Sequence, residues 1–265
     1  MKDIRDDIFR EIMDRSVTAV ILADDAGIIA GTKAAFEKAS ELGLTVDYMV
    51  EEGRSVNPGD EITRFSGGPK QIAQAEELMM GCMAKPSGVA TAAGRCVKAA
   101  DEKVRIVCGS WKKMPAEIKE ALRSAIVVGG ADFRICSPPF IYLDKNYVRL
   151  LGGVEMTLEA VCRLTDYKKV IQIKGDQKDI AWEATIAARG GANIIFIDSG
   201  NHEDINTVSM ELCRNGLRGN VKIAFGGNVK IENIVTLKTR NVDILDIGKE
   251  IIDAPLLDMK MEVIN

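Results

Sequence analysis

The sequence predicts an α/β protein in which an α+β region of about one hundred residues precedes an incomplete α/β barrel. From Val104 onward, short apolar runs alternate with helical segments, a pattern typical of parallel sheets with right-handed crossovers. Six such runs are visible rather than eight, which favours an incomplete barrel and leaves a doubly wound sheet as the alternative. Two of the late runs end in glycine, as phosphate-binding strands of barrels do.

The first hundred residues contain short apolar runs separated by turn residues such as Asn57-Pro58-Gly59-Asp60. Strands are expected at residues 19–22, 28–30, 48–50 and 62–65. An amphipathic helix is expected at 32–42, where Gly43 stops it, and another at 69–83, with Pro69 in its first turn. Ser87 can cap a third helix at 89–100.

In the barrel region, from residue 104 onward, expected strands alternate with expected helices. Strands are expected at residues 104–108, 133–136, 170–173, 194–197, 221–224 and 244–247. Helices are expected at 116–128, 154–164, 180–189, 203–214 and 231–238. Because ligands of such barrels lie at the carboxyl ends of the strands, the residues that follow each run are the candidates for a site.

The run 221–225 ends in Gly226-Gly227, and Asn228 can cap a helix that begins near residue 229. About twenty residues later, the run 242–247 ends in Gly248. Glycine lets the backbone approach an anion, and N–H groups at a helix start can donate to it. We therefore expect a phosphate site formed by Gly226, Gly227, Asn228 and Gly248, the alternative being two tight turns without a ligand.

Composition narrows the function classes. The formal net charge of −4 gives no electrostatic reason to expect nucleic acid or an anionic membrane as a partner. The six cysteines are scattered without a CxxC pair and are expected to be reduced thiols in the cytoplasm. The charged start of the chain does not resemble a signal peptide. His202 is the only histidine, which excludes a multi-histidine metal site and leaves acid–base chemistry to Lys, Asp and Glu.

Several segments, in one order from about Gly27 to the C-terminus, resemble the quinolinate phosphoribosyltransferase family, also called carboxylating nicotinate-nucleotide pyrophosphorylase, and its molybdenum-operon relatives. The segments are 51–59, Ser87-Gly-Val-Ala-Thr91, Trp111-Lys-Lys-Met-Pro115, Gly129-Gly130, Gly152-Gly153, Ile197-Asp198, Gly226-Gly227 and 242–248. The resemblance implies an N-terminal α/β sandwich, an open barrel, and a homodimer whose active site borrows residues from the partner. It also implies binding of phosphoribosyl pyrophosphate with Mg²⁺.

The catalytic pattern of that family is eroded here. Its Thr-Arg-Lys-Thr-x-Pro segment reads Ser110-Trp111-Lys112-Lys113-Met114-Pro115, and its His-Arg pair reads Phe133-Arg134. Its Lys-Asp-Asn-His segment aligns with Asp144-Lys145-Asn146-Tyr147, a helix arginine falls near Glu77, and an acidic strand position falls at Lys174. Lys113 is expected to be a solvated surface charge.

The resemblance therefore implies that Lys112, Arg134, Lys145 and Asp198 are the catalytic candidates, with Asp198 also a candidate magnesium ligand. Trp111, Asn146, Lys174 and Glu77 are the substrate-binding candidates. Trp111 either stacks on a flat ring or packs as a wedge in the barrel mouth. Asp198 could instead cap the following helix, and Arg134 could form an ion pair between strands.

These residues predict a phosphoribosyltransferase-like enzyme that acts on a nitrogen heterocycle other than quinolinate. Quinolinate is a dicarboxylate and needs several cations, whereas Trp111 and Glu77 remove positive charge. The alternative is a non-catalytic binding or accessory protein that keeps the phosphate site. The expected division is a first domain at 1–103 joined by 255–265, and a barrel at 104–254. The expected assembly is a homodimer in the cytoplasm, with helix 69–83 at the interface.

Overall fold

The computed structural model describes residues 3–264, which form two compact units. The first, called the sandwich unit below, holds the described residues up to Gly94 together with 113–130 and 251–264. The second, the barrel unit, holds Arg95–Lys112 and Ala131–Glu250. Residues 95–103 thus group with the barrel, whereas 113–130 and the C-terminal segment group with the sandwich.

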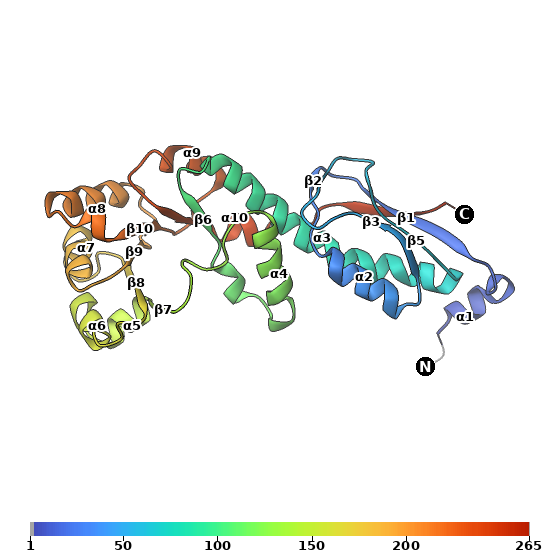
Figure 1. The fold of residues 1–265 in the computed structure, drawn as a ribbon, viewed down its shortest axis with the longest axis horizontal. Coiled ribbons are helices and arrows are strands. Elements are labelled where there is room, and N and C mark those ends of the chain that lie inside the picture. Colours follow the sequence, from blue (N-terminus) through green and yellow to red (C-terminus); the bar gives the residue numbers. More distant parts are fainter. Residues whose placement is uncertain (1–2, 265) are drawn as a thin grey trace. The chain divides into compact units, whose positions relative to one another are not determined.

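The sandwich unit is built on a four-stranded antiparallel sheet in the order β12-β1-β5-β3 (Figure 1). Its strands are β1 (Val17–Ala23), β3 (Thr45–Met49), β5 (Glu61–Gly67) and β12 (Met259–Val263). The two short strands β2 (Gly27–Ile28) and β4 (Ser55–Val56) form a separate pair. Because Ala19 of β1 pairs with Val263, the end of the chain adds the edge strand of the first sheet.

The helices of this unit are α1 (Arg5–Ile8), α2 (Thr32–Glu41) and α4 (Ala116–Val128), with a 3-10 turn η1 (Arg10–Ile12). The helix α3 (Pro69–Ala100) replaces the two helices expected at 69–83 and 89–100, so the predicted break was wrong. Ser87 does not cap a helix. Its buried Oγ accepts a hydrogen bond of 2.9 Å from the N–H of Ala30 and donates one of 3.2 Å to the carbonyl of Ala30.

The barrel unit is built on six parallel strands in the order β6-β11-β10-β9-β8-β7. They are β6 (Arg105–Val107), β7 (Phe140–Leu143), β8 (Lys168–Ile173), β9 (Ile194–Ile197), β10 (Lys222–Phe225) and β11 (Ile244–Asp246). The sheet is therefore the open α/β barrel that the sequence predicted.

One strand was misplaced. The expected strand at 133–136 is a bend, and the second barrel strand is β7 instead. The apolar residues of the bend pack in the core without forming a strand, since Ile135 is buried in the barrel core and Cys136 packs against it. Burial alone therefore produced an apolar run that resembled a strand.

The helices of the barrel unit follow its strands (Figure 1). They are α5 (Lys145–Leu150), α6 (Val154–Ala160), α7 (Ile180–Arg189), α8 (Glu203–Arg214) and α9 (Ile231–Leu237), with the 3-10 turns η2 (Ser110–Lys113) and η3 (Arg218–Asn220). The short helix α10 (Lys249–Ile252) follows β11. The helix expected at 154–164 ends at Ala160 because the chain turns there.

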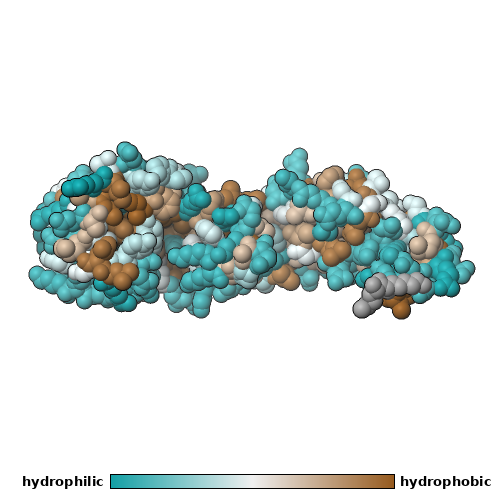
Figure 2. All heavy atoms as spheres, turned by 90° about the horizontal axis from the view of Figure 1, so that it is seen from below, coloured by the Kyte–Doolittle hydropathy of each residue, from teal (hydrophilic) through white to brown (hydrophobic). Residues whose placement is uncertain are grey.

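Each unit has its own apolar core. In the sandwich unit Ile21, Phe65 and Met79 are fully buried. Inside the barrel, Val170, Ile194, Phe196 and Ala224 form a buried cluster with residues of the other strands. Figure 2 shows apolar patches on an otherwise hydrophilic surface. No helix among residues 3–264 is long and apolar enough to cross a membrane.

Candidate active site

Polar side chains meet at the carboxyl ends of β8 and β9. Gln172 lies in β8, is 7% exposed, and donates a hydrogen bond through Nε2 to Oδ2 of Asp198, which follows β9. The Nζ of Lys174 lies 4.0 Å from the same carboxylate oxygen. The Oε1 of Gln172 accepts a 2.9 Å hydrogen bond from the backbone N–H of Lys145. The amide of Gln172 thus bonds to Asp198 and to the backbone of Lys145, and Lys174 joins this group through Asp198.

The sequence analysis did not identify Gln172. A signal was present, because Gln172 is the one polar residue in the apolar run 170–173. A polar side chain buried in a strand needs a partner, and the neighbouring strand end supplies it. Asp198 does not cap the next helix, because α8 begins at Glu203 with His202 in the capping position.

A buried carboxylate holds the loop that carries Lys174. Glu183 of α7 is 2% exposed. Its Oε2 accepts hydrogen bonds from the backbone N–H groups of Lys174 at 3.0 Å and Gly175 at 2.8 Å, and its Oε1 accepts one from Gln177 at 2.9 Å. The sequence analysis placed Glu183 only on a helix. Its role here is to position the loop, since a carboxylate with three N–H donors cannot move without breaking them.

Beside this loop lies a cavity of about 280 Å³. Lys145, Arg149 and Lys174 line it, and the guanidinium of Arg149 pairs with Asp176 at 3.1 Å. With Lys145, Arg149 and Lys174 as cations and Asp176 and Glu183 as carboxylates, the lining has three positive charges against two negative ones. An anionic group is the ligand that this charge favours.

Tyr142 of β7 lies deeper in the barrel mouth. The Nζ of Lys112 lies 5.6 Å from the centre of the Tyr142 ring, and Phe196 packs against that ring edge-on. Burial raises the pKa of the Tyr142 hydroxyl, and the negative charges of Asp246, Asp198 and Asp144 raise it further. Tyr142 is therefore a neutral hydrogen-bonding group at physiological pH, and it shares the mouth with Lys112 and Asp198.

The predicted phosphate loops follow β10 and β11. Gly227 has a φ of +98°, and a Cβ there would lie 3.0 Å from the backbone nitrogen of Gly200 in the loop after β9. Glycine is required at Gly227 both by its backbone angle and by this close approach. Within the part of the chain that the structure describes, the N–H groups of Gly227, Asn228 and Gly248 have no hydrogen-bond partner.

Two details of these loops differ from the expectation. The N–H of Gly226 already donates to the carbonyl of Ile197 at 2.9 Å, and a Cβ on Gly226 would lie 2.6 Å from the Phe196 ring. Gly226 thus has a packing role. Asn228 does not cap a helix, because α9 begins at Ile231 with Lys230 as its N-cap. Asn228 instead has a φ of +61° and an exposed side chain.

Trp111 and Phe133 occupy the edge of the mouth near β6. The indole Nε1 of Trp111 donates a 2.8 Å hydrogen bond to the carbonyl of Phe133, and the two rings meet edge-on at 6.1 Å. The guanidinium of Arg134 lies 5.0 Å from the centre of the Phe133 ring. Trp111 is therefore anchored as a wedge, and Arg134 is exposed and stacked on its neighbour.

Two predicted substrate residues, Glu77 and Asn146, are exposed on their own helices. Glu77 belongs to the sandwich unit, has a 75% exposed side chain and lies 3.6 Å from the guanidinium of Arg5. Asn146 is exposed in the first turn of α5, and its backbone N–H donates to the capping carboxylate of Asp144 at 2.8 Å.

The residues present do not fit a magnesium site made by the protein. Among residues 3–264 no three His, Cys, Asp or Glu side chains group as a metal site. The carboxylate of Asp198 accepts from Gln172 and lies near the ammonium of Lys174, and Oδ1 of Asp246 accepts from the N–H of Gly109 at 3.0 Å. A nearby ammonium competes with a cation for Asp198, so we assign no step to magnesium.

Fold and site together define an open α/β-barrel protein with a cationic, glycine-lined mouth at the carboxyl ends of its strands, preceded in sequence by an α/β unit. A comparison of the sequence with models of known protein families supports this description. Residues 89–262 match the C-terminal domain of quinolinate phosphoribosyl transferase, and residues 3–87 match its N-terminal domain. The chain belongs to the quinolinate phosphoribosyl transferase family.

Curated relatives match over most of their length. A probable carboxylating nicotinate-nucleotide pyrophosphorylase of Archaeoglobus fulgidus is 28% identical over 259 residues, covering 96% of this chain and 97% of the relative. One from Methanothermobacter thermautotrophicus is 26% identical over 260 residues, covering 95% and 91%. The nicotinate-nucleotide pyrophosphorylase structure from Ehrlichia chaffeensis superposes with a TM-score of 0.86 at 13% identity, covering 99% of this chain and 92% of that one.

Proposed function

We propose that this protein transfers a phosphoribosyl group between pyrophosphate and a nitrogen heterocycle that carries less negative charge than quinolinate. The observation that carries the proposal is the meeting of Lys145, Lys174 and Asp198 around Gln172. Lys145 and Asp198 are the catalytic candidates of the family resemblance, Lys174 is a substrate-binding candidate, and all three lie on the same barrel edge as the unpartnered N–H groups of Gly227 and Gly248. The pyrophosphorylase names of the relatives support the same reaction class.

Each group has a role in such a transfer. The bond between the ribose C1 and the pyrophosphate oxygen breaks, and the ring nitrogen forms a new bond to C1. The ammonium groups of Lys112, Lys145 and Lys174 would bind the leaving pyrophosphate, whose negative charge grows in the transition state. The N–H groups of Gly227, Asn228 and Gly248 would bind the 5-phosphate of the ribose. The carboxylate of Asp198 would face the positive charge that develops on the ribose ring.

The residues near β6 indicate how much negative charge the heterocycle carries. A dicarboxylate such as quinolinate is bound through several cations. Here Trp111 and Phe133 contact each other where the family resemblance has an arginine and a histidine, and Arg134 is stacked on Phe133. This edge of the mouth offers apolar ring surface and one exposed guanidinium. It suits a flat ring with one acidic group or none.

A binding protein without transferase chemistry is the second candidate. The observation that favours it is the contact between Lys174 and Asp198, because an ammonium at 4.0 Å neutralises the carboxylate that would face the ribose. Such a protein would keep the affinity for phosphoribosyl pyrophosphate and lose turnover. The two candidates differ in one measurement, the release of pyrophosphate.

The test uses the purified full chain with phosphoribosyl pyrophosphate, Mg²⁺ and a panel of acceptors that includes quinolinate, nicotinate and uncharged pyridines or purines. Pyrophosphate release is followed by a coupled assay, and binding by calorimetry. We expect turnover with a less charged acceptor and its loss in Lys174→Ala and Asp198→Asn. The control is Lys103→Ala, which removes an exposed lysine whose partner is Asp101. Turnover of quinolinate at about 1 per second or faster would contradict the substrate assignment.

We also propose that the protein is a homodimer, as the family resemblance implies. The methionines of α3 give no support to this proposal. Met79 and Met83 are fully buried in the core of their own unit, and Met80 packs against the same core. These three methionines are thus packed within their own unit, and the assembly must be tested by its mass in solution.

A further inference from the structure

A second cavity lies at the opposite ends of the barrel strands. Its volume is about 440 Å³, and its lining residues come from the amino ends of the strands or directly precede them. Arg105 begins β6, Lys168 begins β8 and Lys222 begins β10, while Arg218 belongs to η3 and Cys136 lies before β7. All of these residues belong to the barrel unit.

The cavity has an excess of positive charge. Four cationic side chains line it against one carboxylate, that of Asp243. The guanidinium of Arg218 is committed, since it donates to Asp243 Oδ2 at 2.8 Å and to the carbonyl of Val221 at 2.9 Å. The guanidinium of Arg105 is committed too, since it donates to Asp132 Oδ2 at 2.7 Å and to the carbonyl of Ile135. Among the residues that the structure describes, Lys168 and Lys222 have no ion-pair partner, which leaves two uncompensated charges.

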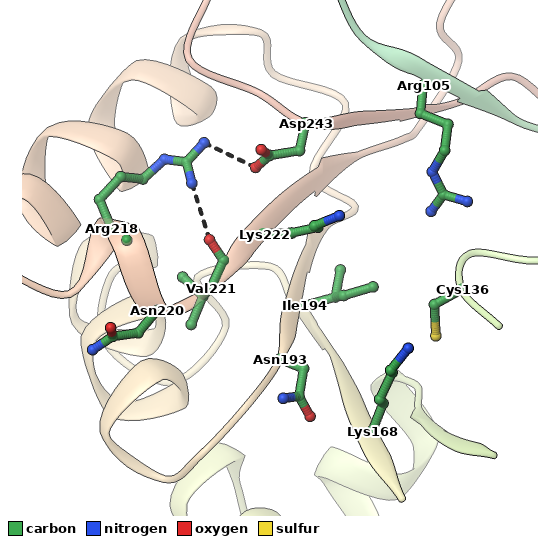
Figure 3. Close-up of a pocket in the computed structure, with 11 residues that line it drawn as sticks. Arg105, Cys136, Lys168, Asn193, Ile194, Arg218, Asn220, Val221, Lys222 and Asp243 are labelled. Atoms are coloured by element: carbon green, nitrogen blue, oxygen red, sulfur yellow. Dashed lines mark hydrogen bonds and ion pairs between the residues drawn. The ribbon is translucent and has the colours of Figure 1, made fainter. Parts of the chain in front are cut away.

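These charges converge. In Figure 3 the side chains of Arg105, Lys168 and Lys222 point from three strands toward one space, and the thiol of Cys136 borders it. The charges that act on the Cys136 thiol are consistent with this arrangement. Burial raises the pKa of the Cys136 thiol, and the positive charges of Lys168, Arg105 and Lys222 each oppose that rise. One sulfur atom therefore senses all three cations.

The apolar core separates this cavity from the candidate active site. Ile194 forms part of the cavity lining and is 4% exposed. Beyond it along the strands lie Phe196 and Ala224, which are equally buried members of the barrel core. A ligand in the cavity would thus not reach Gln172 or Asp198. The apolar floor also strengthens the field of the lysines, because it excludes water on one side.

We propose that this cavity is a second anion site, which binds a small molecule through a phosphate group. The two ammonium groups of Lys168 and Lys222 come from two strands and can donate to different oxygens of one tetrahedral dianion, which suits phosphate better than a planar carboxylate. Folding alone does not account for the arrangement. Like charges that converge over an apolar floor repel each other and reduce stability, so removing Lys168 and Lys222 should leave the protein as stable or make it more stable.

The test uses inorganic phosphate as the probe and Cys136 as a local reporter. The full-length protein is treated with an uncharged maleimide at constant ionic strength, with and without phosphate, and labelling of each cysteine is followed by peptide mass spectrometry. We expect phosphate to slow labelling of Cys136 by about tenfold at saturation, since an occupied cavity blocks access to the thiol. Cys162 is exposed and is the internal control. Sulfate should protect in the same way and acetate should not.

The variant Lys168→Ala/Lys222→Ala should need at least about tenfold more phosphate for the same protection. Lys169→Ala is the matched control, because neighbouring residues of a strand point to opposite faces and Lys169 does not line the cavity. Thermal melting of both variants checks that they are folded. If phosphate leaves Cys136 labelling unchanged, or protects the double variant as well as the wild type, the cavity is not an anion site. Failure of the transferase proposal would leave this result untouched, since the probe here is a thiol in the other mouth.

Discussion

The substitution Glu183→Gln tests how the loop that carries Lys174 is held. In the structure one carboxylate accepts three backbone N–H groups, two on Oε2 and one on Oε1. Glutamine has nearly the same shape, so the helix and the packing around α7 are retained. Its single oxygen can accept from Lys174 and Gly175, but its NH₂ group then faces the N–H of Gln177. Two donors meet, and the N–H of Gln177, a partly buried group in an exposed residue, loses its acceptor.

The expected cost follows from these bonds. Losing a hydrogen bond to a charged group costs about 1.5–3 kcal/mol, and the two remaining bonds lose the assistance of the negative charge. A local destabilisation of about 2 kcal/mol corresponds to an increase of about 30-fold in the opening equilibrium of the loop. Because Lys174 moves with its backbone, binding of phosphoribosyl pyrophosphate should weaken as well.

Hydrogen exchange of the peptide that contains residues 174–177 measures this opening directly. We expect its amides to exchange about 30-fold faster in the variant, while the β9 amides are unchanged. Glu203→Gln is the control, because Glu203 is 67% exposed and its ion pair with Arg240 lies at the surface. The reasoning would be refuted if exchange of the 174–177 amides stayed within about twofold of the wild type, a change below 0.5 kcal/mol by the same relation.

Three further predictions concern a buried thiol, a phosphate-loop glycine and the assembly state. Burial raises the pKa of the Cys108 thiol to about 12, so the folded state keeps a proton that the unfolded chain loses above about pH 9, and stability should fall as the pH rises from there. In urea titrations, Cys108→Ala should make this fall less steep by up to about 1.4 kcal/mol per pH unit. The control, Cys213→Ala at an exposed cysteine, should leave the fall unchanged. Gly227→Ala should weaken the binding of phosphoribosyl pyrophosphate, measured by calorimetry, by about tenfold or more, because a Cβ at a φ of +98° and 3.0 Å from the Gly200 nitrogen must shift the loop. The control is Gly191→Ala, which should bind normally, since Gly191 has a φ of +83° but open space around it. Sedimentation at micromolar concentration should give twice the mass of one chain, and a stable monomer would contradict the proposed homodimer.

The sequence predicted the barrel well where the strands are continuous apolar runs. Residues 194–197 are a strand with the predicted bounds, and 170–173 lies within β8. It failed where apolar residues are buried outside the ladder, as at Ile135, and where a helix continues through a proline, as α3 does at Pro86. Proline lacks an N–H and usually ends a helix. Only the packing of the whole unit shows that this one does not.

The candidate site was predictable in its loops and not in its strands. Glycines after apolar runs mark strand ends in the sequence, so Gly227 and Gly248 were found without a structure. Gln172, Tyr142 and Glu183 lie inside regular elements, where most polar residues are exposed and the local sequence does not mark the buried ones. Which face of β8 points into the barrel depends on its register with β9, where Gln172 pairs with Phe196. That register arises from contacts between distant parts of the chain and is not written in the local pattern.

Once the register is known, the two ends of the barrel follow from a period of two residues. Along β8 the alternate positions are Lys168, Val170 and Gln172, and along β10 they begin with Lys222 and Ala224. Val170 and Ala224 are in the barrel core, Lys168 and Lys222 line the cavity at the amino ends, and Gln172 holds Asp198 at the carboxyl ends. One apolar layer therefore separates two polar mouths. A substitution at Lys168 or Lys222 should change one mouth and leave the other unaffected, because no polar side chain in this series crosses the layer.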